Sequence, residues 1–193
     1  LIPELGGRVF EAYDKVNHYD FLYRQHVIKP ALIGAYGLWI SGGLEFNWPF
    51  HHRPSTFMPV NFSIETEADG TVITWLSECD PTDRTSSTVG IVLHPDAAFF
   101  ETRIQVNNRT PIRHSFLMWQ NAAVPVNDEY QFIFPPDVNY VNNHYSMRKP
   151  PMTYPIAEGV YASAYYDEPT DISWYKNCFH ATSHFAAPSK YDF

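Results

Sequence analysis

Apolar and polar residues alternate over residues 63–67 and again over residues 71–76, on either side of the dipeptide Asp69-Gly70. Alternation with a period of two is typical of a half-buried β-strand, and Asp-Gly is a favoured turn between two paired strands. The pattern therefore predicts a β-hairpin in this part of the chain.

Three further stretches, residues 88–93, 99–106 and 114–124, are rich in β-branched and aromatic residues and are bounded by Pro, Asp, Asn or Gly. They predict consecutive antiparallel strands. The apolar spacing of a long amphipathic helix is not found, and 16 prolines interrupt the chain. We predict an all-β fold in which two sheets pack face to face as a sandwich.

Two segments between the predicted strands are too irregular for a strand and too aromatic for a flexible linker. Residues 31–59 are dense in Gly, Trp, Phe, His and Pro, and residues 135–155 combine several prolines with Tyr, His and Arg. We expect both to be ordered loops, the second wrapping over one face of a sheet. Long ordered loops in compact domains commonly carry function.

The charge balance and the cysteine content exclude several classes of partner. Lys and Arg number 13 against 21 Asp and Glu, a net charge of −8, whereas nucleic-acid binding needs a basic face. No apolar run is long enough for a membrane span. The two cysteines lie far apart, so we expect neither a metal site nor a cofactor. The cellular compartment is left open.

The 193 residues are consistent with a single domain spanning residues 1–193. The chain begins without an initiator Met or a leader-like segment, and it ends in an aromatic segment. We expect a partial domain, cut from a longer protein at both ends. Signatures of serine hydrolases, nucleotide-binding loops and zinc proteases do not occur.

Aromatic residues make up 17% of the chain, more than a core of this size requires. A sugar ring has an apolar C–H face and a rim of hydroxyls, so a sugar site needs an aromatic surface beside polar side chains. Residues 39–54 and 114–121 combine these residue types. The predicted catalytic residue is Glu45, and the predicted sugar-binding residues are Trp39, Asn47, Trp48, His51, His52, Arg53, Trp119, Asn121 and His144.

Spacing supports two pairs within this set. In an extended chain Glu45 and Asn47 share one face, as do Trp119 and Asn121. Structural alternatives stay open: Glu45 could form an ion pair with Arg53, the histidines could bond backbone carbonyls, and the Trp119 ring could belong to the core.

Several motifs together resemble the galactose mutarotase-like superfamily, and more closely a bacterial domain-of-unknown-function branch of it that is often fused to tetratricopeptide repeats. The motifs are Leu5-Gly6-Gly7-Arg8-Val9, residues 39–47, Asn107-Asn108-Arg109-Thr110-Pro111, residues 119–124, Trp174-Tyr175-Lys176-Asn177 and Tyr191-Asp192-Phe193. The resemblance implies a β-supersandwich, truncated at both ends, that binds a carbohydrate on a concave sheet face. It also implies C-terminal tetratricopeptide repeats in the parent protein.

The resemblance also bears on the reaction. Aldose 1-epimerases use a His as general acid and a Glu, late in the chain, as general base. Their His-Gly-Gly motif corresponds here to Ser41-Gly42-Gly43, and the other His position falls near Leu117 or Met118. None of these residues donates a proton as His does, so the resemblance does not imply ordinary mutarotation.

Three functions follow as hypotheses. The first is a glycan-processing enzyme, a glycosidase or an atypical epimerase, with Glu45 catalytic and Asp80, Asp83 or Glu129 as a second carboxylate. The second is a non-catalytic carbohydrate-binding module. The third is a structural or interaction domain whose aromatic residues all belong to the core.

Overall fold

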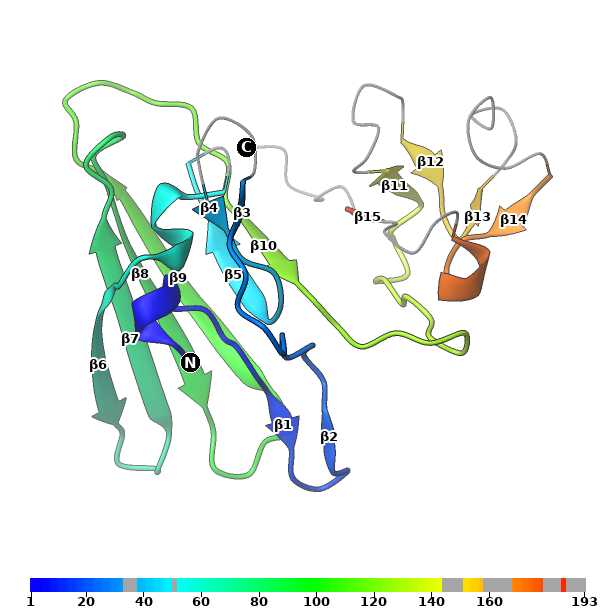
Figure 1. Ribbon diagram of the computed structural model, residues 1–193, viewed down its shortest axis with the longest axis horizontal. Helices are drawn as coiled ribbons and strands as arrows, with labels where there is room; N and C mark the ends of the chain where they lie inside the picture. Colours follow the sequence, from blue (N-terminus) through cyan, green and yellow to red (C-terminus); the bar gives the residue numbers. More distant parts are fainter. Residues whose placement is uncertain (33–37, 50–51, 144–150, 158–167, 179–184, 187–193) are drawn as a thin grey trace. The chain divides into compact units, whose positions relative to one another are not determined.

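A computed structural model describes residues 1–32, 38–49, 52–143, 151–157, 168–178 and 185–186 (Figure 1). The chain forms two compact units, Leu1–Pro125 and Val126–Phe193. The described residues form strands and short 3-10 helices, so the all-β prediction is confirmed. Within these residues no helix is long and apolar enough to cross a membrane.

A four-stranded antiparallel sheet dominates the first unit (Figure 1). Its strands, in spatial order, are β6 (Asn61–Thr66), β7 (Val72–Cys79), β8 (Thr85–Leu93) and β9 (Phe100–Asn108). The predicted hairpin is confirmed as β6 and β7, with Gly70 at a φ of 87° in the turn. The register aligns Leu76, Val89 and Ile104, so one face of the sheet carries a continuous apolar row.

A smaller sheet pairs β5 (Leu44–Asn47) with β10 (Trp119–Ala122) in antiparallel register. Val9 joins its edge through a bridge to Leu44. Leu44 and Phe46 share a buried cluster with the apolar row of the larger sheet, because alternate side chains of β5 point to one side. The buried members are Val9, Leu22, Leu44, Phe46, Trp48, Leu76, Val89 and Ile91.

Short elements complete the first unit. They are η1 (Pro3–Leu5), β1 (Tyr13–Asp14), β2 (Tyr19–Asp20), β3 (Ala31–Leu32), β4 (Leu38–Trp39) and η3 (Pro54–Phe57). The predicted loop at residues 31–59 thus contains two short strands, β5 and a helical turn. The predicted strand at 114–124 is shorter, as β10, because its partner β5 ends before Pro49, which has no backbone N–H for a ladder.

The second unit has its own small core, formed by Val141, Met152, Ala157 and Ile172. Its elements are β11 (Tyr140–Asn143), β12 (Met152–Thr153), β13 (Ile156–Ala157), β14 (Thr170–Asp171), η6 (Tyr175–Asn177) and β15 (Phe185–Ala186). Strand β11 pairs with β12 and β15, and β13 pairs with β14. The prediction of an ordered loop at 135–155 is therefore only partly right, since β11 and β12 are strands.

We expect Gly43→Ala to destabilise the first unit far more than Gly70→Ala. Both glycines have positive φ, which costs an alanine about 1–2 kcal/mol. At Gly43, just before β5, an added Cβ would also lie 2.1 Å from the Val9 carbonyl oxygen, whereas at Gly70 its closest neighbour is a Pro95 carbon at 3.5 Å. Urea unfolding of both variants checks this, and equal losses would contradict the geometry.

Candidate functional site

Four of the predicted site residues lie on one face of the small sheet. The register places Asn121 opposite Glu45 and Trp119 opposite Asn47. Residues directly opposite in an antiparallel pair share a face, and this face is turned away from the apolar side of β5. We call it the polar face, defined by Glu45, Asn47, Trp119 and Asn121. The two-residue spacings identified in the sequence are therefore confirmed as shared faces.

Glu45 lies at the centre of a dense set of hydrogen-bond donors, although only 3% of it is exposed. Arg8 approaches Oε2 with an N–O distance of 2.6 Å, and His52 Nδ1 lies 2.7 Å from Oε1. The carboxylate also accepts from Asn47 Nδ2 at 2.9 Å, Trp39 Nε1 at 3.1 Å and Thr56 Oγ1 at 3.3 Å. Each oxygen thus has several donors, which satisfies a buried carboxylate.

These contacts fix the charge of Glu45. Burial alone would raise the pKa of its carboxyl, but the His52 hydrogen bond, the Arg8 charge and the Asn47 amide outweigh burial and lower that pKa to about 2. Glu45 is therefore ionised at neutral pH and does not carry a proton to donate. Its geometry suits a positioning role, because it orients the side chains that surround it.

His52 is held against the polar face by two tryptophans and by Glu45. Its ring centre lies 5.8 Å from that of Trp39 and 4.7 Å from that of Trp119, both in edge-on arrangements. The side chain is 14% exposed, while Nδ1 is buried. The exposed part of the imidazole is therefore away from Glu45. Trp119 and Asn121 are also only partly buried, so this group of side chains reaches the surface.

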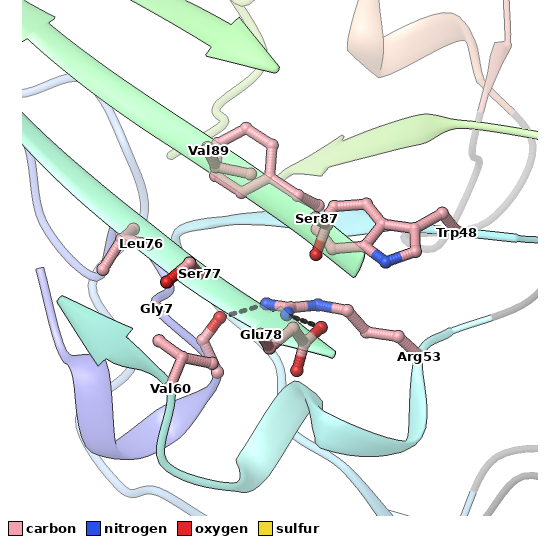
Figure 2. A pocket seen from close by; sticks show the side chains of 11 residues that line it. Gly7, Trp48, Arg53, Val60, Leu76, Ser77, Glu78, Ser87 and Val89 are labelled. Carbon is pink, nitrogen blue, oxygen red and sulfur yellow. Dashed lines mark hydrogen bonds and ion pairs between the residues drawn. The ribbon is translucent and has the colours of Figure 1, made fainter. Parts of the chain in front are cut away.

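Trp48 and Arg53 lie on the other side of β5, inside the sandwich. Figure 2 shows the Arg53 guanidinium beside Glu78 of β7, with which it forms an ion pair. Its guanidinium carbon is 4.8 Å from the Trp48 ring centre, and both residues are almost fully buried. The hollow that they line measures about 10 Å³, too little for a sugar. Both side chains are therefore part of the interior and not of the polar face.

The sequence did not reveal the charged partner of Glu45. The alternative considered there, a Glu45–Arg53 ion pair, is wrong: Arg8 pairs with Glu45, and Arg53 pairs with Glu78. Arg8 belongs to the Gly6-Gly7-Arg8 motif. A charged residue followed directly by apolar residues is the sequence feature that could have indicated a buried arginine in need of a carboxylate. Both glycines have positive φ, near 70°. A Cβ at Gly6 would lie 2.5 Å from the Thr56 carbonyl oxygen, so the chain passes close to η3 there.

The remaining candidates are two histidines and three carboxylates. His51 and His144 lie outside the described residues. Asp80 and Asp83 lie in the turn after β7, where burial and then the neighbouring Asp80 raise the pKa of Asp83. Glu129 belongs to the second unit. Neither Asp80 nor Asp83 contacts Glu45, and no three His, Cys, Asp or Glu side chains in the described part of the chain gather as a metal site.

Comparison with known proteins places this all-β domain in a family. The sequence profile of a domain of unknown function, DUF5107, matches residues 1–189, so the chain belongs to that family. The structure is similar to the crystal structure of a TPR-domain containing protein from Parabacteroides distasonis, with 25% sequence identity and a TM-score of 0.66. The match covers 72% of this chain and 24% of that protein, so this chain corresponds to about a quarter of its length.

We expect Glu45→Gln to lower the free energy of unfolding by about 3 kcal/mol at pH 7. The substitution removes a carboxylate whose pKa is lowered by the fold, and it leaves Arg8 buried without a counter-charge. A carboxyl with a lowered pKa stabilises the fold above its ordinary value of 4.5, and this stability is lost as the pH falls toward 2. The deficit of the variant should therefore shrink over that range.

Urea unfolding of both proteins at several pH values tests this expectation. Glu101→Gln serves as the control, because Glu101 is 46% exposed and its ion pairs are on the surface. The control should change stability by less than about 1 kcal/mol. A Glu45→Gln deficit that stays constant from pH 7 to pH 3 would contradict the assignment.

Proposed function

We propose that this domain binds a carbohydrate on the polar face of β5 and β10. The observation that carries the proposal is the partly exposed Trp119 ring. Asn121 lies on the same face of the sheet, and the His52 ring packs against Trp119. An aromatic ring can stack on the C–H face of a sugar, while an amide and an imidazole exchange hydrogen bonds with its hydroxyls.

The rigidity of this face also supports binding. Glu45 and Asn47 are almost fully buried and hydrogen-bonded to each other, and they lie directly across from Asn121 and Trp119. The surface side chains therefore rest on a layer that is already ordered. A preorganised face loses less conformational entropy on binding, which raises affinity for a given set of contacts.

Family resemblance supplies a second line of support. The sequence motifs resemble the galactose mutarotase-like superfamily, whose members are β-supersandwiches that bind sugars on a sheet face, and the two packed sheets are compatible with that architecture. The similarity to a TPR-domain containing protein leads us to propose that this domain works alongside tetratricopeptide repeats in a longer polypeptide.

We expect Trp119→Ala to weaken sugar binding by about tenfold, because an aromatic anchor at the centre of a site commonly contributes 1–2 kcal/mol. Trp75→Ala is the matched control. Trp75 lies on the outer face of the larger sheet, over Gly90, and bonds Glu65. Proton NMR titration with a panel of mono- and oligosaccharides measures the effect. Equal affinities for both variants would remove Trp119 from the site, and no binding to the wild type would refute the proposal.

The Glu45–His52 contact favours a second candidate function, the processing of a bound glycan. A carboxylate 2.7 Å from one imidazole nitrogen orients the ring, an arrangement that many enzymes use for proton transfer. In this version His52 exchanges a proton with the substrate through its second nitrogen, and Glu45 is the positioning residue.

For this candidate we expect wild-type protein to change the anomeric proton signals of a sugar over time, and His52→Gln to slow that change by about 100-fold. Affinity for the sugar should fall much less than the rate does, because Gln keeps a hydrogen-bonding group at this position. Line broadening without chemical change in the wild type would leave binding as the sole function. Conversion at an undiminished rate in His52→Gln would exclude His52 as the proton-transfer group.

A further inference from the structure

A second hollow in the first unit, of about 140 Å³, lies at one end of the sandwich. The inner-face positions that include Val89 of β8 and Ile104 of β9 continue, with the strand period of two, to Thr85 and Asn108. These two residues lie directly opposite each other and line the hollow, which therefore begins where the apolar core ends. Its lining includes no residue of the polar face.

Hydrogen bonds hold the walls of this hollow in place. The Leu117 backbone N–H donates to the Pro49 carbonyl at 2.5 Å. The Asn108 side chain donates to the Ile112 carbonyl at 2.7 Å and accepts from the Thr110 backbone N–H at 2.9 Å. The walls are therefore ordered, and the polar atoms of Asn108 are already engaged within its own loop.

Thr85 is a buried polar residue of this lining whose hydroxyl the fold does not use. It is 7% exposed, and its Oγ1 has no hydrogen-bond partner among the described residues. This Oγ1 is not one of the enclosed unpaired atoms of the fold, so it keeps accessible surface that a ligand in the hollow can reach. A buried polar group without a partner is costly, and a hydrogen bond to a ligand would remove that cost.

Asp83 brings a carboxyl group to the same lining. The neighbouring Asp80 is fixed beside it, because its two oxygens accept the backbone N–H groups of Thr82 and Asp83 at 3.0 and 3.1 Å. Burial, then the hydrogen bond with Asp80 and its like charge, raise the pKa of Asp83, and the charge of His114 opposes them as the smallest of these effects. A positive charge in the hollow would favour the Asp83 carboxylate.

The size and the apolar walls narrow the choice of ligand. A cavity of about 150 Å³ holds one molecule of benzene, whereas a hexose has twice as many non-hydrogen atoms and is too large to fit inside. Pro49, Val106 and the Phe116 ring, which is 51% exposed, offer apolar surface for a short hydrocarbon stem. No three metal-ligating side chains gather in the described part of the chain, so an organic cation suits Asp83 better than a metal ion.

We propose that this hollow binds the ammonium group and short stem of a primary alkyl amine. An ammonium group carries three N–H donors, and the lining supplies the Asp83 carboxylate and the Thr85 and Ser115 hydroxyls as acceptors. The stem packs against the apolar walls, as the stem of a lysine does on an apolar surface. The inference is independent of sugar binding, since the hollow and the polar face share no side chain.

Three probes with the same five-carbon stem test the head group: n-pentylamine is a cation, n-pentanol is neutral and n-pentanoate is an anion. The backbone amide signals of Ser115 and Phe116 in nitrogen-15 NMR titrations report the hollow. We expect saturable shifts with n-pentylamine, and binding of n-pentanol weaker by about tenfold or more, because charge-assisted hydrogen bonds are the stronger ones. The anion should bind most weakly. Equal affinity for the amine and the alcohol, or silence toward the amine, would overturn the proposal.

A fourth probe, Nα-acetyl-L-lysine amide, separates the two sources of such a group. Binding as strong as that of n-pentylamine would support a lysine side chain of another protein as the ligand. Exclusion of the lysine derivative, with n-pentylamine bound, would support a free amine.

Asp83→Asn keeps the shape of the side chain but removes its charge. It should weaken n-pentylamine by about tenfold or more and leave n-pentanol unchanged. Asp96→Asn is the matched control, because Asp96 is exposed in the turn after β8, at the other end of that strand. It should change neither affinity. Undiminished amine binding in Asp83→Asn would show attraction by the overall negative charge alone and would overturn the proposal.

Thr85→Val removes the hydroxyl and keeps a side chain of similar shape. Because Oγ1 has no partner among the described residues, the variant should unfold at the temperature of the wild type or higher, while it binds n-pentylamine several-fold more weakly. A clear fall in the unfolding temperature would assign the hydroxyl to the fold. That result, or an unchanged affinity for the amine, would overturn the proposed contact.

Discussion

The buried ion pair between Arg8 and Glu45 is the interaction on which the first unit depends. Both side chains are 3% exposed, and their atoms approach to 2.6 Å. Two charges taken out of water are tolerated only when each is neutralised and hydrogen-bonded. Glu45 meets this condition through four further donors, and Arg8 also donates to the Gly42 carbonyl at 2.5 Å. The pair therefore holds the N-terminal segment, the turn before β5 and helix η3 in one arrangement.

Strand β5 links this electrostatic centre to the hydrophobic core. Its even-numbered residues Leu44 and Phe46 pack into the apolar cluster, and its odd-numbered residues Glu45 and Asn47 support the polar face. Because the side-chain period of a strand is two, a shift of one residue in register would exchange the two sets. The same apolar contacts that stabilise the sandwich thus also set the positions of Trp119 and Asn121.

Local patterns predicted the parts of this structure that local physics determines. The Asp69-Gly70 hairpin and the shared faces of residues 45 and 47, and of 119 and 121, follow from turn chemistry and strand periodicity alone. The partners of Arg8 and Arg53 could not be predicted, because they lie 37 and 25 residues away in the sequence and depend on how the loops close. The division of the chain into two units left no clear mark in its composition either.

Strands β5 and β10 pair with each other although all four strands of the larger sheet, β6 to β9, lie between them in the sequence. Contacts between distant segments form slowly, because closing a long loop costs entropy before the contacts stabilise it. During synthesis, the Arg8–Glu45 pair and the β6–β9 sheet can form before Trp119 and Asn121 leave the ribosome. Until then one edge of β5 is unpaired. The polar face is complete only when β10 pairs with that edge and adds Trp119 and Asn121.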